Sequence, residues 1–318
     1  MFELSLDELR NYEGRNPRPE DFDNYWTEAI TDLEQVDRQV HLAPVEHPSV
    51  VADCFDLTFQ GVSGARLYAK YLRPANPTGD KHPAIAVFHG YKISSPDWFA
   101  LLPYVAQGYS VAALDCRGQG GRSQDLGGTP GAALNGHLVG GLAGPPQGLL
   151  YRHNFLDCVE LTWILADMEE VDPSRIGVTG ISQGGGLSLA CAALNPEVRA
   201  AALAYPFLSD YLRVWEMDLA ENAYAELRQY LRSFDPTHAH ADEMFERLGY
   251  IDVQHLAPRI EAQVLMATAL RDEVCPPSTQ FAAYNRIRNA EMVLYPDHEH
   301  ERLPGFDDCM FNFFSQVL

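Results

Sequence analysis

The sequence predicts a protein of the α/β class, with a mainly parallel, twisted sheet and helices on both faces. Short apolar runs, typical of strands buried on both sides, alternate with helical patterns from about residue 82 onward. The chain has 318 residues, of which 46% are hydrophobic and 21% charged, so it can bury a sizeable core. We therefore expect a single domain over residues 1–318.

Residues 1–40 are expected to form a helical arm that lies over the main body. This segment is polar and acidic, and Pro17 and Pro19 place a break before a second helix that begins near Asp21. A β-hairpin follows over residues 51–74. There VADCFDLTFQ and ARLYAKYLRP each carry apolar residues with period two, and GVSG lies between them.

The rest of the chain alternates between the two element types. Strands are predicted in the runs HPAIAVFHG, YSVAALDCRGQG, RIGVTGISQGGG, AALAYPFL, EAQVLMATALRDE and EMVLYPDHEHE. Helices are predicted in WFALLPYVAQG, FLDCVELTWILADMEE and LSLACAALN. Two segments interrupt this order. Residues 121–150 form a glycine-rich loop expected to be functional or interface-forming, and about 208–258 form a helical, acidic cap inserted between two core strands.

The net charge and the cysteine content indicate which binding partners and which cellular compartment to expect. The net charge of −21 argues against nucleic acid or an anionic membrane surface as a partner. Six cysteines show neither a CxxC pair nor zinc-ligand spacing, so we expect reduced, mostly buried thiols. With no secretory pattern and no long apolar stretch in the sequence, a cytoplasmic location is expected.

A candidate nucleophile lies where a predicted strand meets a predicted helix. The run Gly180-Ile181-Ser182-Gln183-Gly184 matches G-x-S-x-G, which in this context is typical of a nucleophile elbow. Glycines suit such a turn because the serine is strained and side chains beside it would collide with the strand and helix. The alternative is a glycine-rich turn that binds a phosphate or nothing.

The partners that such a serine needs follow in the order expected of an α/β-hydrolase. A serine requires a histidine to take its proton and a carboxylate to orient that histidine. One late strand runs into Asp272 and Glu273, and the next runs into a DHEHE segment containing His298 and His300. Spacing alone does not separate the two acids or the two histidines, and the HEHE cluster has no further ligand set with matching spacing for a metal.

Two backbone N–H groups are expected to form an oxyanion hole. One comes from Gln183, directly after the nucleophile, and the other from the loop His89-Gly90-Tyr91 after an early strand. His89 precedes the serine and lies in that loop, so we interpret it as a loop-shaping residue rather than the base.

These motifs resemble carbohydrate esterase family 7, the acetyl xylan esterase and cephalosporin C deacetylase group of α/β-hydrolases. The resemblance rests on Arg117-Gly118-Gln119, on the GISQGG run around Ser182 and on His300-Glu301. The stretches FHGY, DEVCPPSTQFAAYN and YPDHEHERLPGF add to it, and it covers nearly the whole chain.

The resemblance implies roles for particular residues. Ser182 would be the nucleophile, Asp272 the acid and His300 the base, with the Tyr91 and Gln183 amides as the oxyanion hole. Arg117 and Gln119 would brace the active-site loops, and Glu301 would be a further supporting residue. No metal or organic cofactor is implied, and His298 would be a loop residue peculiar to this sequence.

The same resemblance implies a function and an assembly. It implies removal of acetyl groups from small esters such as acetylated xylo-oligosaccharides and cephalosporin C, by a homohexamer whose active sites face an internal chamber. A serine peptidase or longer-chain esterase on the same core is an alternative, because the triad does not choose the acyl group. A non-catalytic binding protein on this fold is another, although it would have no need of all three groups.

Overall fold

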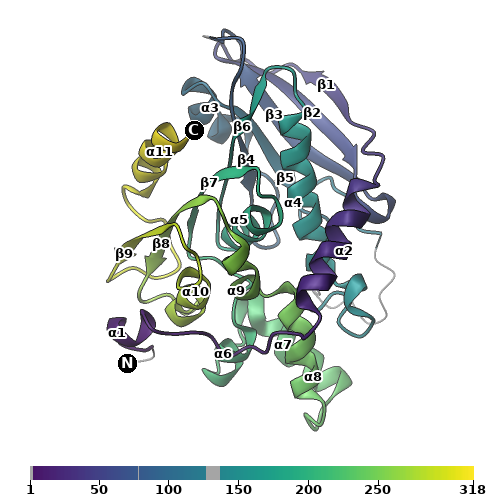
Figure 1. Cartoon of the computed structure of the whole chain (residues 1–318), viewed down its shortest axis with the longest axis vertical. Helices are drawn as coiled ribbons and strands as arrows, with labels where there is room; N and C mark the ends of the chain where they lie inside the picture. The colour runs from purple at the N-terminus through teal and green to yellow at the C-terminus, as the bar shows by residue number, and fades with distance from the viewer. Residues whose placement is uncertain (1–2, 78, 127–136) are drawn as a thin grey trace.

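A computed structural model describes residues 3–77, 79–126 and 137–318 of the chain. Its described residues form a nine-stranded sheet in the order β1-β2-β3-β5-β4-β6-β7-β8-β9 (Figure 1). The strands are β1 His41–Val45, β2 Ala52–Gln60, β3 Arg66–Pro74, β4 His82–Phe88, β5 Ser110–Asp115, β6 Val171–Ile181, β7 Val198–Ala204, β8 Gln263–Ala269 and β9 Ala290–Tyr295.

The sheet has an antiparallel part and a longer parallel part. Strands β1, β2, β3 and β5 pair antiparallel, and the β2–β3 pair is the hairpin predicted from the sequence. Strands β5, β4, β6, β7, β8 and β9 pair parallel, which confirms the mainly parallel sheet. Strand β1 was not predicted. It is a five-residue edge strand containing Pro44, and proline is tolerated in a sheet at an edge.

Helices cover both faces of the sheet (Figure 1). One core lies between the sheet and α2, α4 and α5, and a smaller core lies between the other face and α3 and α11. The α-helices are α1 Leu6–Leu9, α2 Phe22–Glu34, α3 Trp98–Ala106, α4 Leu150–Ala166, α5 Gln183–Leu194, α6 Tyr211–Glu216, α7 Ala225–Phe234, α8 Ala241–Leu248, α9 Val253–Leu256, α10 Pro277–Tyr284 and α11 Phe306–Val317.

The N-terminal segment packs on the body through α2. This helix begins after Asp21, as predicted, and buries Phe22, Trp26 and Leu33 on one face. The Trp26 ring stacks on Phe155 of α4, with 5.8 Å between the ring centroids. The short helix α1 lies beside α10, far along the sequence (Figure 1).

The segment between β7 and β8 is helical and contains α6, α7, α8 and α9. Its amphipathic helices bury apolar side chains, including Leu227 and Leu231 of α7 and Leu248 of α8. Our interpretation of residues 208–258 as a cap stays a prediction. Residues 127–136 of the predicted glycine-rich loop lie outside the described residues.

No helix in the described ranges combines the length and the apolar character that crossing a bilayer requires.

Candidate active site

Ser182 lies in a tight turn between β6 and α5. Its φ is positive, with φ 59° and ψ −117°, which is a strained conformation for a serine. The Ser182 N–H donates to the Ala204 carbonyl, and the Ser182 carbonyl accepts from Phe207 N, both at 3.0 Å. The turn is therefore held by the neighbouring strand β7 and by the residues that follow it.

The glycines of the motif are required by close backbone contacts. A Cβ on Gly184 would lie 2.0 Å from the Phe88 carbonyl oxygen, and one on Gly186 would lie 2.2 Å from the Phe207 carbonyl oxygen. These atoms belong to the backbone, so rotation of a side chain cannot relieve the clash. The glycine-rich turn thus lets α5 start directly against β4.

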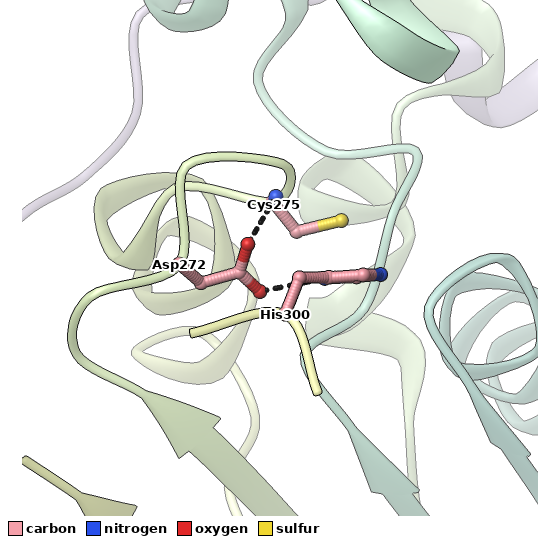
Figure 2. Close-up of side chains that lie close together, drawn as sticks. All are labelled: Asp272, Cys275 and His300. Carbon is pink, nitrogen blue, oxygen red and sulfur yellow. Dashed lines mark hydrogen bonds and ion pairs between the residues drawn. The ribbon is translucent and has the colours of Figure 1, made fainter. Parts of the chain in front are cut away.

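The structure brings Ser182, His300 and Asp272 together. The His300 Nε2 atom lies 3.1 Å from the Ser182 hydroxyl oxygen, and Nδ1 lies 2.8 Å from Asp272 Oδ2. Figure 2 shows the Asp272 carboxylate directed at the imidazole. Glu273 is exposed and His298 packs on Tyr295, so the geometry separates the two acids and the two histidines that spacing left open.

Asp272 is fully buried after β8, and the turn satisfies its second oxygen. Val274 N and Cys275 N each donate to Asp272 Oδ1 at 2.8 Å. A buried carboxylate is costly unless it is hydrogen-bonded, and here three donors surround it. The carboxylate is therefore fixed in the orientation that meets His300.

The Cys275 thiol lies beside the same two side chains (Figure 2). Ligand atoms of Asp272, Cys275 and His300 lie within 4.8 Å of one another, and this is the one group of potential metal ligands found in the described ranges. Burial, and then the Asp272 charge, raise the pKa of the Cys275 thiol well above its ordinary value. The thiol therefore stays protonated, and the Asp272 oxygens already accept hydrogen bonds. This arrangement suits a triad better than a metal centre.

Tyr205 packs against the candidate base. Its ring lies 4.5 Å from the His300 ring, centroid to centroid, and its hydroxyl donates to the Glu301 carbonyl at 2.9 Å. Glu301 thus meets this tyrosine through its backbone, while its carboxylate is exposed and accepts from Glu299 N at 3.2 Å. The contacts hold the His300 loop over β7.

The side chain of Gln183 joins the turn to the loop after β4. Gln183 Nε2 donates to the carbonyls of His89 and Gly90 at 3.2 and 3.4 Å. Gln183 Oε1 accepts from Tyr151 of α4 and from Gln119, at 2.6 and 2.8 Å. Gln119 Oε1 in turn accepts from Lys92 N at 2.8 Å. The two glutamines therefore brace the backbone on both sides of Tyr91.

His89 shapes the same loop. Its Nε2 accepts from Cys116 N at 2.9 Å, so the proton lies on Nδ1, which donates to the Gly90 carbonyl at 2.7 Å. Burial lowers the pKa of His89, so the ring stays neutral.

Arg117 is directed away from this loop. Its Nε and Nη2 pair with both carboxylate oxygens of Asp157 in α4, at 2.7 and 2.6 Å, and both side chains are buried. The pair ties the end of β5 to α4.

Several residues near the site were not predicted. Tyr205 and Cys275 contact the candidate triad, Tyr151 contacts Gln183, and Glu226 contacts Tyr91. Two sequence features could have pointed to some of them: Tyr205 comes directly after β7, a strand that was predicted, and Cys275 lies in the turn after Asp272. A tyrosine or glutamate inside a helix, as with Tyr151 and Glu226, gives none.

A parallel sheet with a serine elbow after a central strand defines the class: the fold is that of the α/β-hydrolases. A solved Pyrococcus horikoshii acylaminoacyl peptidase shares it, with a TM-score of 0.63 and 17% identity over 84% of this chain and 42% of that one. The family is more specific. The model of the acetyl xylan esterase family matches residues 1–317, so the chain belongs to that family of enzymes, as its motifs indicated.

Individual relatives agree with this assignment. The crystal structure of acetyl xylan esterase 1 from Thermoanaerobacterium sp. JW/SL YS485 has a TM-score of 0.96 and 51% identity, covering 99% of both chains. An acetyl xylan esterase from Paenibacillus sp. R4 has a TM-score of 0.94 and 33% identity, covering 99% of this chain and all of that one. The acetyl esterase Axe7A of Xylanibacter ruminicola is 26% identical over 289 residues. The match spans 63% of the length of that curated relative.

Proposed function

We propose that this chain is a serine esterase that removes acetyl groups from small acetylated substrates, such as xylo-oligosaccharides and cephalosporin C. The observation that carries the proposal is the hydrogen-bonded series Ser182, His300 and Asp272. The acyl group is inferred from the family and from the acetyl xylan esterases that this chain resembles.

The tautomer of His300 suits it to act as the base. Its Nδ1–H donates to Asp272, which leaves Nε2 free to accept the Ser182 proton. The Ser182 oxygen then attacks the acetyl carbonyl, and the developing oxyanion accepts from the Tyr91 and Gln183 N–H groups. The N-terminus of α5 adds a favourable dipole at that position.

The intermediate collapses by expelling the alcohol, which takes the proton from His300 and leaves an acetyl group on Ser182. Water then enters, gives a proton to His300 and attacks the acetyl carbon. Ser182 leaves with that proton, and acetate is released. Gln119 supports this chemistry by bracing the loop after β4, Arg117 by tying the end of β5 to α4, and Glu301 through the backbone contact that holds His300.

Assembly and location are further parts of the proposal. The family resemblance supports a homohexamer, which sedimentation would reveal as a particle about six times the 35.5 kDa of one chain. All six cysteines are free thiols, which supports a reducing, cytoplasmic location. Recovery of the native protein in a periplasmic or secreted fraction would contradict that location.

The test is hydrolysis of 4-nitrophenyl acetate by Ser182→Ala and His300→Ala. Each should lower kcat by about a thousandfold or more, because the nucleophile or its base is lost. His298→Ala is the matched control and should keep the wild-type rate. A fluorophosphonate should label Ser182 in the wild type. Near-wild-type rates in either triad variant would overturn the proposal.

Substrate choice needs a separate panel. Acetyl, butyryl and octanoyl esters, a peptide amide, cephalosporin C and an acetylated xylo-oligosaccharide should be compared by kcat/KM. The proposal expects the acetyl esters to be cleaved fastest, with acetate released from both natural substrates. A preference for the octanoyl ester or the amide would favour a different hydrolase.

A further inference from the structure

Glu226 of α7 is a buried carboxylate that connects three segments far apart in the chain. It is only 2% exposed. One oxygen accepts a short hydrogen bond from the Tyr91 hydroxyl. The other accepts from Leu138 N at 2.8 Å and from Val139 N at 3.3 Å. One side chain therefore links the helical segment after β7, the loop after β4, and the residues before α4.

Burial of this carboxylate needs an explanation. Its nearest cation is Lys92, whose Nζ lies 3.8 Å away and whose side chain is 42% exposed, so the ion pair is weak. Burial raises the pKa of Glu226, and its hydrogen bonds oppose that rise. An apolar residue would pack α7 at lower cost, because a buried carboxylate must recover its lost hydration from its partners.

Tyr91 is the residue that gains most from the contact. Its ring packs edge-on against Phe207 and His137, with centroid distances of 5.5 and 5.6 Å. Burial and the Glu226 charge raise the pKa of the Tyr91 phenol, so it remains a hydrogen-bond donor. The glutamines brace the backbone on either side of Tyr91, and Glu226 holds its side chain.

We infer that Glu226 is a positioning residue of the active site, which holds Tyr91 so that its backbone N–H keeps the place needed in the oxyanion hole. This inference rests on the proposed function. It means that the segment after β7 takes part in transition-state stabilisation without touching the substrate. Donors in an oxyanion hole must lie at hydrogen-bond distance from the developing oxyanion, and a misplacement of about 1 Å can cost about a hundredfold in rate.

Kinetics of Glu226→Ala and Tyr91→Phe test the inference. Tyr91→Phe removes the hydroxyl and keeps both the ring and the backbone N–H. We expect kcat for 4-nitrophenyl acetate to fall about tenfold to a hundredfold in each, part of the loss caused by deleting an oxyanion donor. KM should change less than about twofold, because the contact acts on the transition state. The double variant should be no slower than the worse single variant, since both break one contact.

Two variants serve as controls. Tyr250→Phe breaks another tyrosine–carboxylate hydrogen bond, from Tyr250 to Asp21 at 2.5 Å, which involves neither Tyr91 nor Glu226, and should leave kcat unchanged. Glu226→Gln keeps one carbonyl oxygen to accept from the Leu138 and Val139 N–H groups. Relative to Glu226→Ala, the Glu226→Gln variant should regain most of the lost thermal stability. It should regain a smaller part of the lost kcat.

Hydrogen exchange gives a readout independent of activity. In Glu226→Ala the amides of residues 89–92 and of Leu138 and Val139 should exchange faster, while those of β4 should not. Unchanged exchange there would overturn the inference, and so would unchanged kcat or a loss confined to KM. A wild type that neither cleaves acetyl esters nor takes the fluorophosphonate would overturn the proposed function, whereas the exchange result would still decide the physical link.

Discussion

Ser182 occupies its turn because the neighbouring glycines leave room for the backbone of two other segments. We predict that Gly184→Ala destabilises the protein by about 2 kcal/mol or more and lowers esterase activity, since its Cβ would overlap the Phe88 carbonyl. Urea denaturation measures the first effect. Gly148→Ala, with nothing within 4 Å of the added Cβ, is the control and should be near neutral.

The charge and the position of Asp272 both support its role as the acid that orients His300. Asp272→Asn keeps the shape and should lower kcat by about ten-thousandfold, because the amide no longer holds His300 in the tautomer that accepts from Ser182. KM for 4-nitrophenyl acetate should change little. Glu273→Gln, at the adjacent exposed position, is the matched control. Equal losses in both variants would contradict the assignment of the acid.

Among single residues, the sequence predicted the serine, the acid and the histidine of the candidate triad, because their chemistry restricts both residue type and order along the chain. A serine elbow followed by an acid and then a histidine at later strand ends is typical of an α/β-hydrolase triad. Spacing did not separate His298 from His300, and the contact with Asp272 and Ser182 does so. Glu226 could not be predicted, because its role depends on which segments fold against it, whereas the strand end before Tyr205 was a signal that the sequence offered.

Among the elements, the N-terminal segment is held in part by one carboxylate. Asp210 accepts from Tyr12 Oη at 2.8 Å and from the backbone N–H groups of Arg15 and Asn16, at 3.0 and 2.8 Å. Asp210→Ala would leave these donors unpaired. We predict faster tryptic cleavage after Arg10 and Arg15, because the segment detaches more often.

The control for this experiment is Asp235→Ala. Asp235 accepts from the N–H groups of Ala239 and His240 in an exposed turn, so its loss should leave cleavage at the N-terminal arginines unchanged. A cleavage rate for Asp210→Ala equal to that of the wild type would show that other contacts hold the segment.

The predicted elements agree with the structure where the hydrophobic period is clear. The parallel strands and α2, α3 and α5 lie where the sequence placed them, within a few residues. Helix α4 begins at Leu150, five residues before the predicted start at Phe155, because Leu150 and Tyr151 are also buried. Helices α10 and α11 were missed. Both follow irregular segments that carry the candidate site, and those segments drew the interpretation toward loops.

For the whole molecule, the pH dependence of stability contains a contribution from Glu160 of α4. Burial, followed by the Asp157 charge, raises its pKa to about 8, while Arg38 and Arg117 oppose the rise. The folded protein thus keeps a proton that the unfolded chain loses near its ordinary pKa of 4.5. The contribution of Glu160 to the free energy of unfolding is therefore fully present below pH 4.5 and is lost as the pH rises toward about 8.

We predict that Glu160→Gln becomes more stable relative to the wild type as the pH rises. The gain between about pH 6 and about pH 8 should be about 2 kcal/mol, because the glutamine has no proton to lose. Urea denaturation of both proteins at the two pH values measures it. The exposed Glu169→Gln should show the same stability difference at both values. A constant difference for Glu160→Gln would contradict the prediction.

The order of the strands has a consequence for the synthesis of the protein. Ser182 and His300 are separated by 118 residues, and Asp272 follows a strand that is made after the whole helical segment. Because chains fold progressively as they leave the ribosome, the elbow can form while its base is still unmade. A nascent chain halted before β9 should therefore carry Ser182 without reacting with a fluorophosphonate. Ser182 in the growing polypeptide thus becomes reactive only after nearly all of the sheet has been synthesised.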